Sequence, residues 1–85
     1  MTIRDLQNAV EHKVERSCKR ILESDSSESM TYQYYGASAI ISFCETNNII
    51  SKEMYKKYDA MIEKAHKDYY KKAKSDFESA HKRLF

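Results

Sequence analysis

Residues that interrupt helices are almost absent from this sequence of 85 residues, which holds one glycine and no proline. Sheet proteins of this size need several tight turns, and glycine and proline are prominent among the residues that form them. Charged residues make up 33% of the chain, and most are lysine and glutamate, which lose little rotamer freedom in a helix. The composition therefore predicts an all-α protein.

Cysteines and long apolar runs are also scarce. The two cysteines, Cys18 and Cys44, are too few for a disulfide framework. No apolar run approaches the ~18 residues of a membrane span, and the alternating polar and apolar N-terminal residues do not resemble a secretory signal. Both cysteines fall on apolar stripes, where burial raises the pKa of a thiol and makes it inert. We expect a cytoplasmic protein with two free thiols, in the host cytoplasm if a phage encodes it.

Apolar residues recur at steps of three and four along three segments, which is the spacing of one face of a helix. The predicted helices span residues 3–23, 31–46 and 52–84. A chain of this length forms one domain. We therefore expect residues 1–85 to form a three-helix bundle, in which the second helix and the long C-terminal helix make an antiparallel hairpin and the first helix packs across them.

Local signals mark the ends of these helices. Thr2 and Asp5 have the spacing of a capping box. The polar stretch 24–29 has no apolar anchor, and we expect it to be the most mobile part of the chain. Asn47-Asn48 is a stop signal, because asparagine tolerates the left-handed conformation that ends helices, and Ser51 caps the third helix.

The second helix carries apolar residues beside its apolar stripe as well as on it. Tyr35, Ile40 and Phe43 widen its apolar face, so we expect it to be the most buried of the three. Gly36 costs roughly 1 kcal/mol of helix stability relative to alanine. Because Gly36 begins a run of small residues, we expect another backbone to pack closely against it.

Residue patterns typical of catalysis are weak. Glu63-x-x-His66 and Glu78-x-x-His81 have the carboxylate–imidazole spacing of ferritin-like metal sites, but the two pairs lie ~22 Å apart on one helix and lack facing carboxylates. A glycine-rich phosphate loop is excluded by the single glycine. We expect no enzyme activity, no metal and no cofactor, with His66 and His81 as solvated or flanking side chains on a lysine-rich helix.

Basic residues are unevenly distributed. Residues 1–50 carry 5 basic and 7 acidic side chains, whereas residues 51–85 carry 10 basic and 6 acidic ones. The basic residues fall along one face of the third helix and one of the first: Lys57, Lys64, Lys67, Lys71 and Lys74, and Lys13, Arg16 and Arg20. Basic helices with aromatic side chains can follow a phosphate backbone and stack bases. The same pattern also fits a solvated face with interleaved acids.

Tyrosine is unusually frequent, with seven in the chain. Tyrosine is enriched at protein interfaces because it offers a large contact area with a polar tip. We assign Tyr34, Tyr58 and Tyr69 to the seams between helices. The predicted partner-binding residues are Tyr32, Tyr35, Tyr55, Lys64, Lys67, Tyr70, Lys71 and Lys74.

The apolar stripe of the third helix continues to its end. A helix of 33 residues is about 50 Å long at 1.5 Å per residue, and the second helix is about half that length. Leaving Phe77 and Leu84 in water would cost roughly 1.5–3 kcal/mol each. We therefore expect a homodimer in which the C-terminal halves of two third helices pack together through these residues.

One stretch resembles a known kind of protein. Tyr35-Gly36-Ala37 through Phe43, followed by Asn48-Ile49-Ile50-Ser51-x-Glu53, resembles a helical hairpin found in small proteins of Gram-positive bacteria and their phages, a group that includes anti-CRISPR inhibitors. The resemblance covers no functional motif and implies no site residues. It implies an inhibitor or adaptor that docks on a larger protein, such as a host-defence protein that handles nucleic acid. Direct binding of DNA or RNA and a structural oligomer subunit remain the alternatives.

Overall fold

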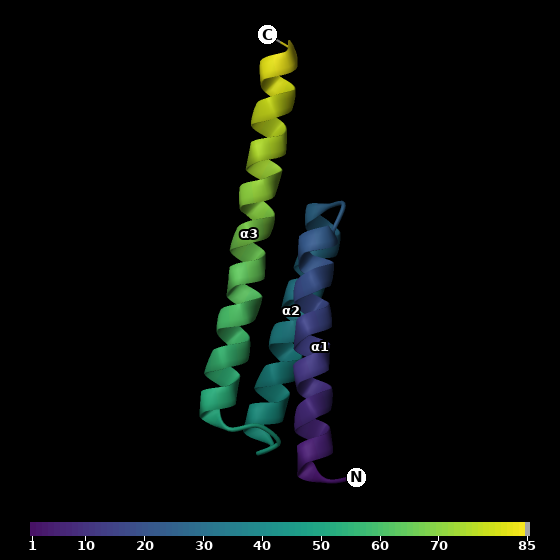
Figure 1. Ribbon diagram of the computed structural model, residues 1–85, viewed down its shortest axis with the longest axis vertical. Helices are drawn as coiled ribbons and strands as arrows, with labels where there is room; N and C mark the ends of the chain where they lie inside the picture. Colours follow the sequence, from purple (N-terminus) through teal and green to yellow (C-terminus); the bar gives the residue numbers. More distant parts are fainter. Residues whose placement is uncertain (85) are drawn as a thin grey trace.

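The computed structural model consists of three helices joined by two short connections (Figure 1). Helix α1 spans Ile3–Glu23, α2 spans Ser27–Thr46 and α3 spans Lys52–Leu84. The structure describes the backbone of residues 1–84 and the side chains of residues 1–80. Within this described part there is no strand, and each helix packs against the other two. The predicted all-α, three-helix architecture is confirmed.

Side-chain caps set the starts of α1 and α2. The Thr2 hydroxyl accepts a hydrogen bond from the Asp5 amide at 3.2 Å, and the Asp5 carboxylate accepts one from the Thr2 amide at 3.1 Å. Helix α2 begins at Ser27, a few residues before the approximate start predicted from the sequence. The Ser26 hydroxyl accepts a hydrogen bond from the Ser29 amide at 3.1 Å and caps the helix one turn earlier. The residues of the predicted mobile stretch after Ser26 are therefore helical.

The connection between α2 and α3 forms as its sequence predicts. Asn48 has a φ of 59°, the left-handed conformation, and the Ile49 amide donates to the Cys44 carbonyl at 2.8 Å. The Ser51 hydroxyl accepts a hydrogen bond from the Met54 amide at 3.1 Å and caps α3. The Gln7 side-chain amide donates to the Ile49 carbonyl at 3.1 Å, so this connection is also held against α1.

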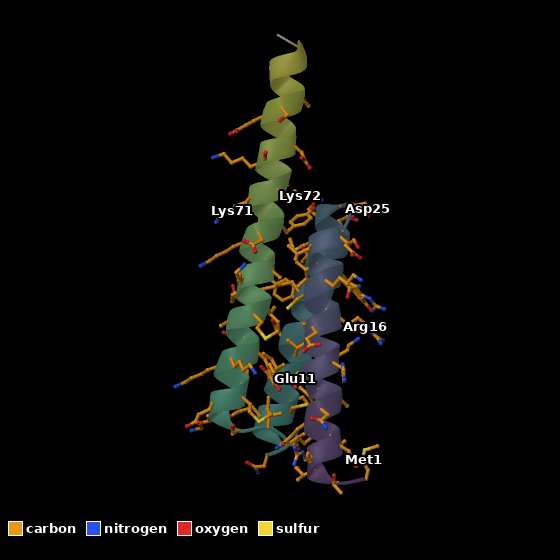
Figure 2. The ribbon with its side chains drawn as sticks, viewed as in Figure 1. Met1, Glu11, Arg16, Asp25, Lys71 and Lys72 are labelled. Atoms are coloured by element: carbon orange, nitrogen blue, oxygen red, sulfur yellow. The ribbon has the colours of Figure 1, made fainter. Side chains whose placement is uncertain are left out.

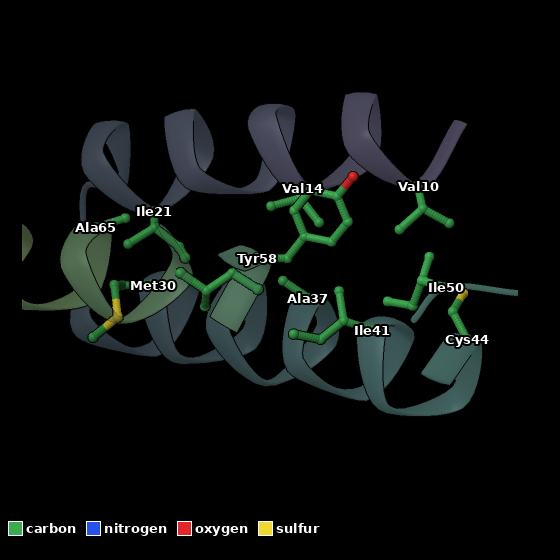
Figure 3. Close-up of a cluster of buried hydrophobic side chains, with 11 residues drawn as sticks. Val10, Val14, Ile21, Met30, Ala37, Ile41, Cys44, Ile50, Tyr58 and Ala65 are labelled. Atoms are coloured by element: carbon green, nitrogen blue, oxygen red, sulfur yellow. The ribbon is translucent and has the colours of Figure 1, made fainter. Parts of the chain in front are cut away.

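The core lies where all three helices run side by side (Figure 3). It is built from Val10, Val14, Ile21, Met30, Ala37, Ile41, Cys44, Ile50, Tyr58, Ile62 and Ala65. The largest of its fully enclosed side chains include Ile21, Ile41 and Ile62, each with no exposed surface. Burying a side chain of this size stabilises the fold by roughly 1.5–3 kcal/mol. On α3, the last buried residue within the described part is Ala65.

Two expectations for α2 were wrong. Tyr35 and Phe43 are 65% and 63% exposed and do not widen the buried face of α2. Of the three residues expected to widen this face, only Ile40 is partly buried and packs against the core. The predicted close backbone approach at Gly36 is also absent, because no atom of the described chain lies within 4 Å of the position that a Cβ would occupy.

The C-terminal part of α3 extends beyond α1 and α2 (Figure 1). The molecule measures 58 Å along its longest axis and 20 Å and 16 Å across. Residues 71–80 of α3 are all exposed, although Lys72, Ala73 and Asp76 line a shallow groove with Leu22 at the end of α1. A search of the described residues finds no helix with the length and apolar composition needed to cross a membrane.

Candidate partner-binding surfaces

A cluster of aromatic rings joins α2 to α3 on one side of the bundle. The Tyr34 hydroxyl donates a hydrogen bond to the Glu63 carboxylate, and the Tyr34 ring stacks on His66 with 4.3 Å between ring centroids and 30° between ring planes. The hydrogen bond to Glu63, reinforced by burial, raises the pKa of Tyr34 to about 12. Tyr34 is therefore a packed residue of the helix seam, as predicted, and stays protonated at neutral pH.

Two predicted partner-binding residues extend this cluster to the surface. The ring of Tyr35 meets the ring of Tyr34 edge-on at 5.2 Å, and Tyr70 meets His66 edge-on at 5.0 Å. Tyr35 is 65% exposed and Tyr70 is 49% exposed. Of the two alternatives predicted for His66, solvated or flanking, the second holds, because its ring is half-buried between two tyrosines. The i, i+4 spacing of His66 and Tyr70 was the signal for this contact.

Tyr55 lies apart from the aromatic cluster. It is half-buried near the start of α3 and packs against the core. A shallow groove of about 350 Å³ between α2 and α3 is lined by Tyr55 together with Ser42, Glu45, Thr46, Lys52 and Lys56. The predicted tyrosines therefore do not form one continuous surface with Tyr55.

The predicted lysines of α3 are partly neutralised by neighbouring acids. The Lys64 amine lies 2.9 Å from the Asp68 carboxylate, a contact that raises the pKa of Lys64 and lowers that of Asp68. Lys74 lies 4.0 Å from Glu78. Lys67 and Lys71 are exposed and form no ion pair with any side chain that the structure describes. This face therefore presents less free positive charge than its sequence suggests.

A second groove, of about 260 Å³, lies between α1 and α2. It is lined by Lys13, Ser17, Arg20, Tyr32, Gln33, Gly36, Ala37 and Ile40. Tyr32 is 78% exposed, and Phe43 projects from α2 one turn beyond the groove. Sequence analysis missed this surface because Ile40 and Phe43 read as buried. The basic residues on this side lie opposite the lysines of α3, as Figure 2 shows for Arg16 and Lys71.

The two thiols lie among the packed helices. Burial raises the pKa of both thiols, and the nearby Glu15 carboxylate adds to the effect at Cys18. Both thiols are free, with Cys44 buried and Cys18 half-buried. Among the described residues there is no group of three or more histidine, cysteine, aspartate or glutamate side chains that could hold a metal ion.

Phe77, a predicted oligomer contact, is 70% exposed on the extended part of α3. The other, Leu84, has a side chain outside the described residues. Comparisons with protein-family models, curated proteins and solved structures found no match. The resemblance to small phage proteins therefore stays a prediction.

Proposed function

We propose that this chain is a small non-catalytic protein that docks on a larger protein as an inhibitor or adaptor. The observation that carries the proposal is the exposure of three large aromatic side chains on α2: Tyr32, Tyr35 and Phe43 are 78%, 65% and 63% exposed. Aromatic residues in the centre of an interface supply a large share of binding energy. A contiguous exposed apolar patch on a small protein often marks an interaction site.

The frame of the proposed surface is an antiparallel α2–α3 hairpin, supported by contacts at both of its ends. Tyr34 of α2 contacts Glu63 and His66, whereas Ser42 of α2 shares a groove with Tyr55 of α3. Packing of α2 against the core fixes the backbone positions from which its exposed aromatic side chains project. Such preorganisation reduces the conformational entropy lost on association.

The class of partner is proposed from the resemblance stated above. A phage-type protein of this size fits an inhibitor of a host-defence protein that handles nucleic acid, as anti-CRISPR proteins are, and acts in the host cytoplasm. The predicted docking residues on α3, Lys64, Lys67, Tyr70, Lys71 and Lys74, would then flank the aromatic side chains of α2. The Tyr35–Tyr34–His66–Tyr70 ring contacts support one surface that continues from α2 onto α3.

The test is affinity capture from the source cell followed by mass spectrometry, with a matched surface variant. The variant combines Tyr32→Ser, Tyr35→Ser and Phe43→Ser, and circular dichroism checks that it is folded. We expect a partner that the wild type captures and the variant loses. Identical captured proteins for both forms would contradict the proposal.

Direct binding of DNA or RNA is the alternative function that the basic residues favour. The pairing of Lys64 with Asp68 and of Lys74 with Glu78 weakens this alternative. Phosphate contacts release counterions, so such binding falls steeply with salt. Mobility-shift assays should show at most weak, salt-sensitive binding by the isolated protein, and tight binding at physiological salt would favour the alternative.

We also propose a homodimer formed by the extended ends of two α3 helices. The support is that residues 71–80 are exposed and include Ala73, Phe77 and Ala80 on one apolar stripe. Two-fold symmetry would bring the same stripe of each copy together. Light scattering should give a dimer for the wild type and a monomer for Phe77→Asp with Leu84→Asp. A wild-type monomer at micromolar concentrations would contradict the dimer, and a dimeric double variant would contradict this seam.

A further inference from the structure

Gly36 occupies an unusual position on α2. Glycine lowers the stability of a helix interior, and it is retained where a backbone must approach closely or adopt a positive φ. Gly36 has a normal helical φ, and apart from its two chain neighbours and the backbone of its own helix, no atom of the described chain comes within 4 Å of its Cβ position. Folding of the isolated chain therefore gives no reason for glycine here. A molecule outside this chain would explain it.

The surroundings of Gly36 have the features of a docking groove. Gly36, Ala37 and Ile40 contribute small and apolar surface to the groove between α1 and α2. Tyr32 and Phe43 stand near its two ends and are both largely exposed. Eleven residues separate them, which is ~16 Å or about three helical turns along α2. A partner helix of three or four turns matches this length.

The charged side chains among the described lining residues of this groove are all basic. Lys13 and Arg20 of α1 line one wall, and no acidic side chain appears among its described lining residues. Neither cation forms an ion pair within the part of the chain described, and the same holds for Arg16 on the same flank of α1. Two unpaired cations beside an apolar floor are complementary to a helix that is apolar on one face and acidic along its edge.

We propose that the α1–α2 groove binds an acidic amphipathic helix of the partner protein, with its backbone packed over Gly36 and its carboxylates beside Lys13 and Arg20. This inference rests on the proposed protein-binding function. Lys13 and Arg20 would attract phosphates as well as carboxylates, so the choice of ligand depends on the apolar part of the lining. The side chains of Ala37 and Ile40 are complementary to the apolar face of such a helix and not to a phosphate backbone.

The test uses a designed peptide in place of the unidentified partner. The peptide has about 18 residues, because isolated helices shorter than ~12–15 residues are marginal in water. It carries leucines at helical spacing on one face and glutamates along the edges, and a second peptide has lysine in place of every glutamate. Fluorescence anisotropy measures the affinity of the full chain for each. We expect saturable binding of the acidic peptide and at least ~10-fold weaker binding of the basic one.

Two groove variants locate the site. Lys13→Glu with Arg20→Glu should weaken binding of the acidic peptide by ~10-fold or more, because two attractive contacts become repulsive. Gly36→Gln should also weaken it, because its side chain enters the groove. Glutamine is a good helix former, and its Cβ meets no neighbouring helix at this exposed position, so this variant should fold at least as stably as the wild type. That result would separate blocked binding from unfolding.

A control variant changes the net charge equally outside the groove. Lys19→Glu with Lys72→Glu, two exposed residues that do not line this groove, should leave the affinity for the acidic peptide within about twofold of the wild type. The inference is overturned by absence of binding, by equal binding of both peptides, or by equal losses in the control and groove variants. It is also overturned if a single-stranded oligonucleotide binds this groove more tightly than the peptide. In each case the capture experiment would still decide the proposed function, because it depends on the exposed aromatic residues of α2.

Discussion

Replacing Gly36 by alanine should stabilise the isolated protein. Alanine is favoured over glycine in a helix interior by ~0.8–1.0 kcal/mol, because glycine has more backbone freedom to lose. The new methyl group would meet no atom of the described chain within 4 Å, so no steric cost offsets this gain. Gly36 is exposed, so the methyl group adds little packing. We expect the free energy of unfolding to rise by about 0.5–1 kcal/mol.

Urea denaturation followed by far-UV circular dichroism measures this change. The midpoint should rise while the slope with urea stays the same, since the surface exposed on unfolding hardly changes. In a domain of this size, 1 kcal/mol corresponds to an increase in Tm of roughly 4–8 °C. The matched control is Ala39→Gly, three residues further along α2 and also exposed, which should destabilise by a similar amount. The double variant should return close to the wild type.

A loss of stability in Gly36→Ala would refute the reasoning. It would mean that another group occupies the space over Gly36 in the isolated protein. Repeating the measurement over a range of protein concentrations separates the two sources of such a group. A loss of stability that grows with protein concentration would mean that the group belongs to a second copy of the chain. A loss of stability that is independent of concentration would mean that the group belongs to the same chain.

Three further predictions concern the core and the titratable groups. In an absorbance titration, Tyr34 should ionise near pH 12, and Glu63→Gln should lower its pKa toward 10. Because the pKa of Tyr34 is raised in the folded state, its contribution to stability is present below pH 10 and is lost as the pH rises toward 12. Equal titration of the wild type and the variant would refute the contact between Tyr34 and Glu63. Ile62→Ala should lower the free energy of unfolding by ~2–5 kcal/mol in urea, since it leaves a cavity in the core, and a loss under 1 kcal/mol would contradict its burial. Cys18 and Cys44 should react slowly with iodoacetamide at neutral pH and much faster in denaturant, because burial raises the pKa of both thiols. Equal reaction rates in the folded protein and in denaturant would contradict the burial of these thiols.

Local chemistry explains why much of the fold was predictable. The capping box at Thr2 and the left-handed Asn48 depend on residues within a few positions, so the sequence contains the whole signal. The stripe of α3 is long and regular, and its range follows from periodicity alone. The start of α2 was harder, because four serines lie between residues 24 and 29 and each can cap a helix. Only the structure shows that Ser26 is the cap.

The candidate surfaces were less predictable because they depend on how helices face one another. Periodicity identifies an apolar stripe, but it does not say how much of the stripe's margin a neighbouring helix covers. Tyr35 and Phe43 lie on that margin, and both are outside the core. Likewise, no spacing within α3 indicates that His66 stacks on Tyr34, which is 32 residues earlier in the chain. The groove beside Gly36 combines residues of α1 and α2, so no single segment could reveal it.

The proposed recognition and assembly surfaces lie in different parts of the molecule, and the position of the core explains how both can exist. The lining of the α1–α2 groove includes Ser17 and Ala37, which are both buried, so the contacts that fold the protein also fix the shape of the groove. On α3, by contrast, residues 66–80 include none that is buried. A charge at Phe77 should therefore abolish a dimer without altering the affinity of the groove for an acidic helix. If Phe77→Asp changed both, the groove would have to be completed by the second copy, and the two surfaces would be one.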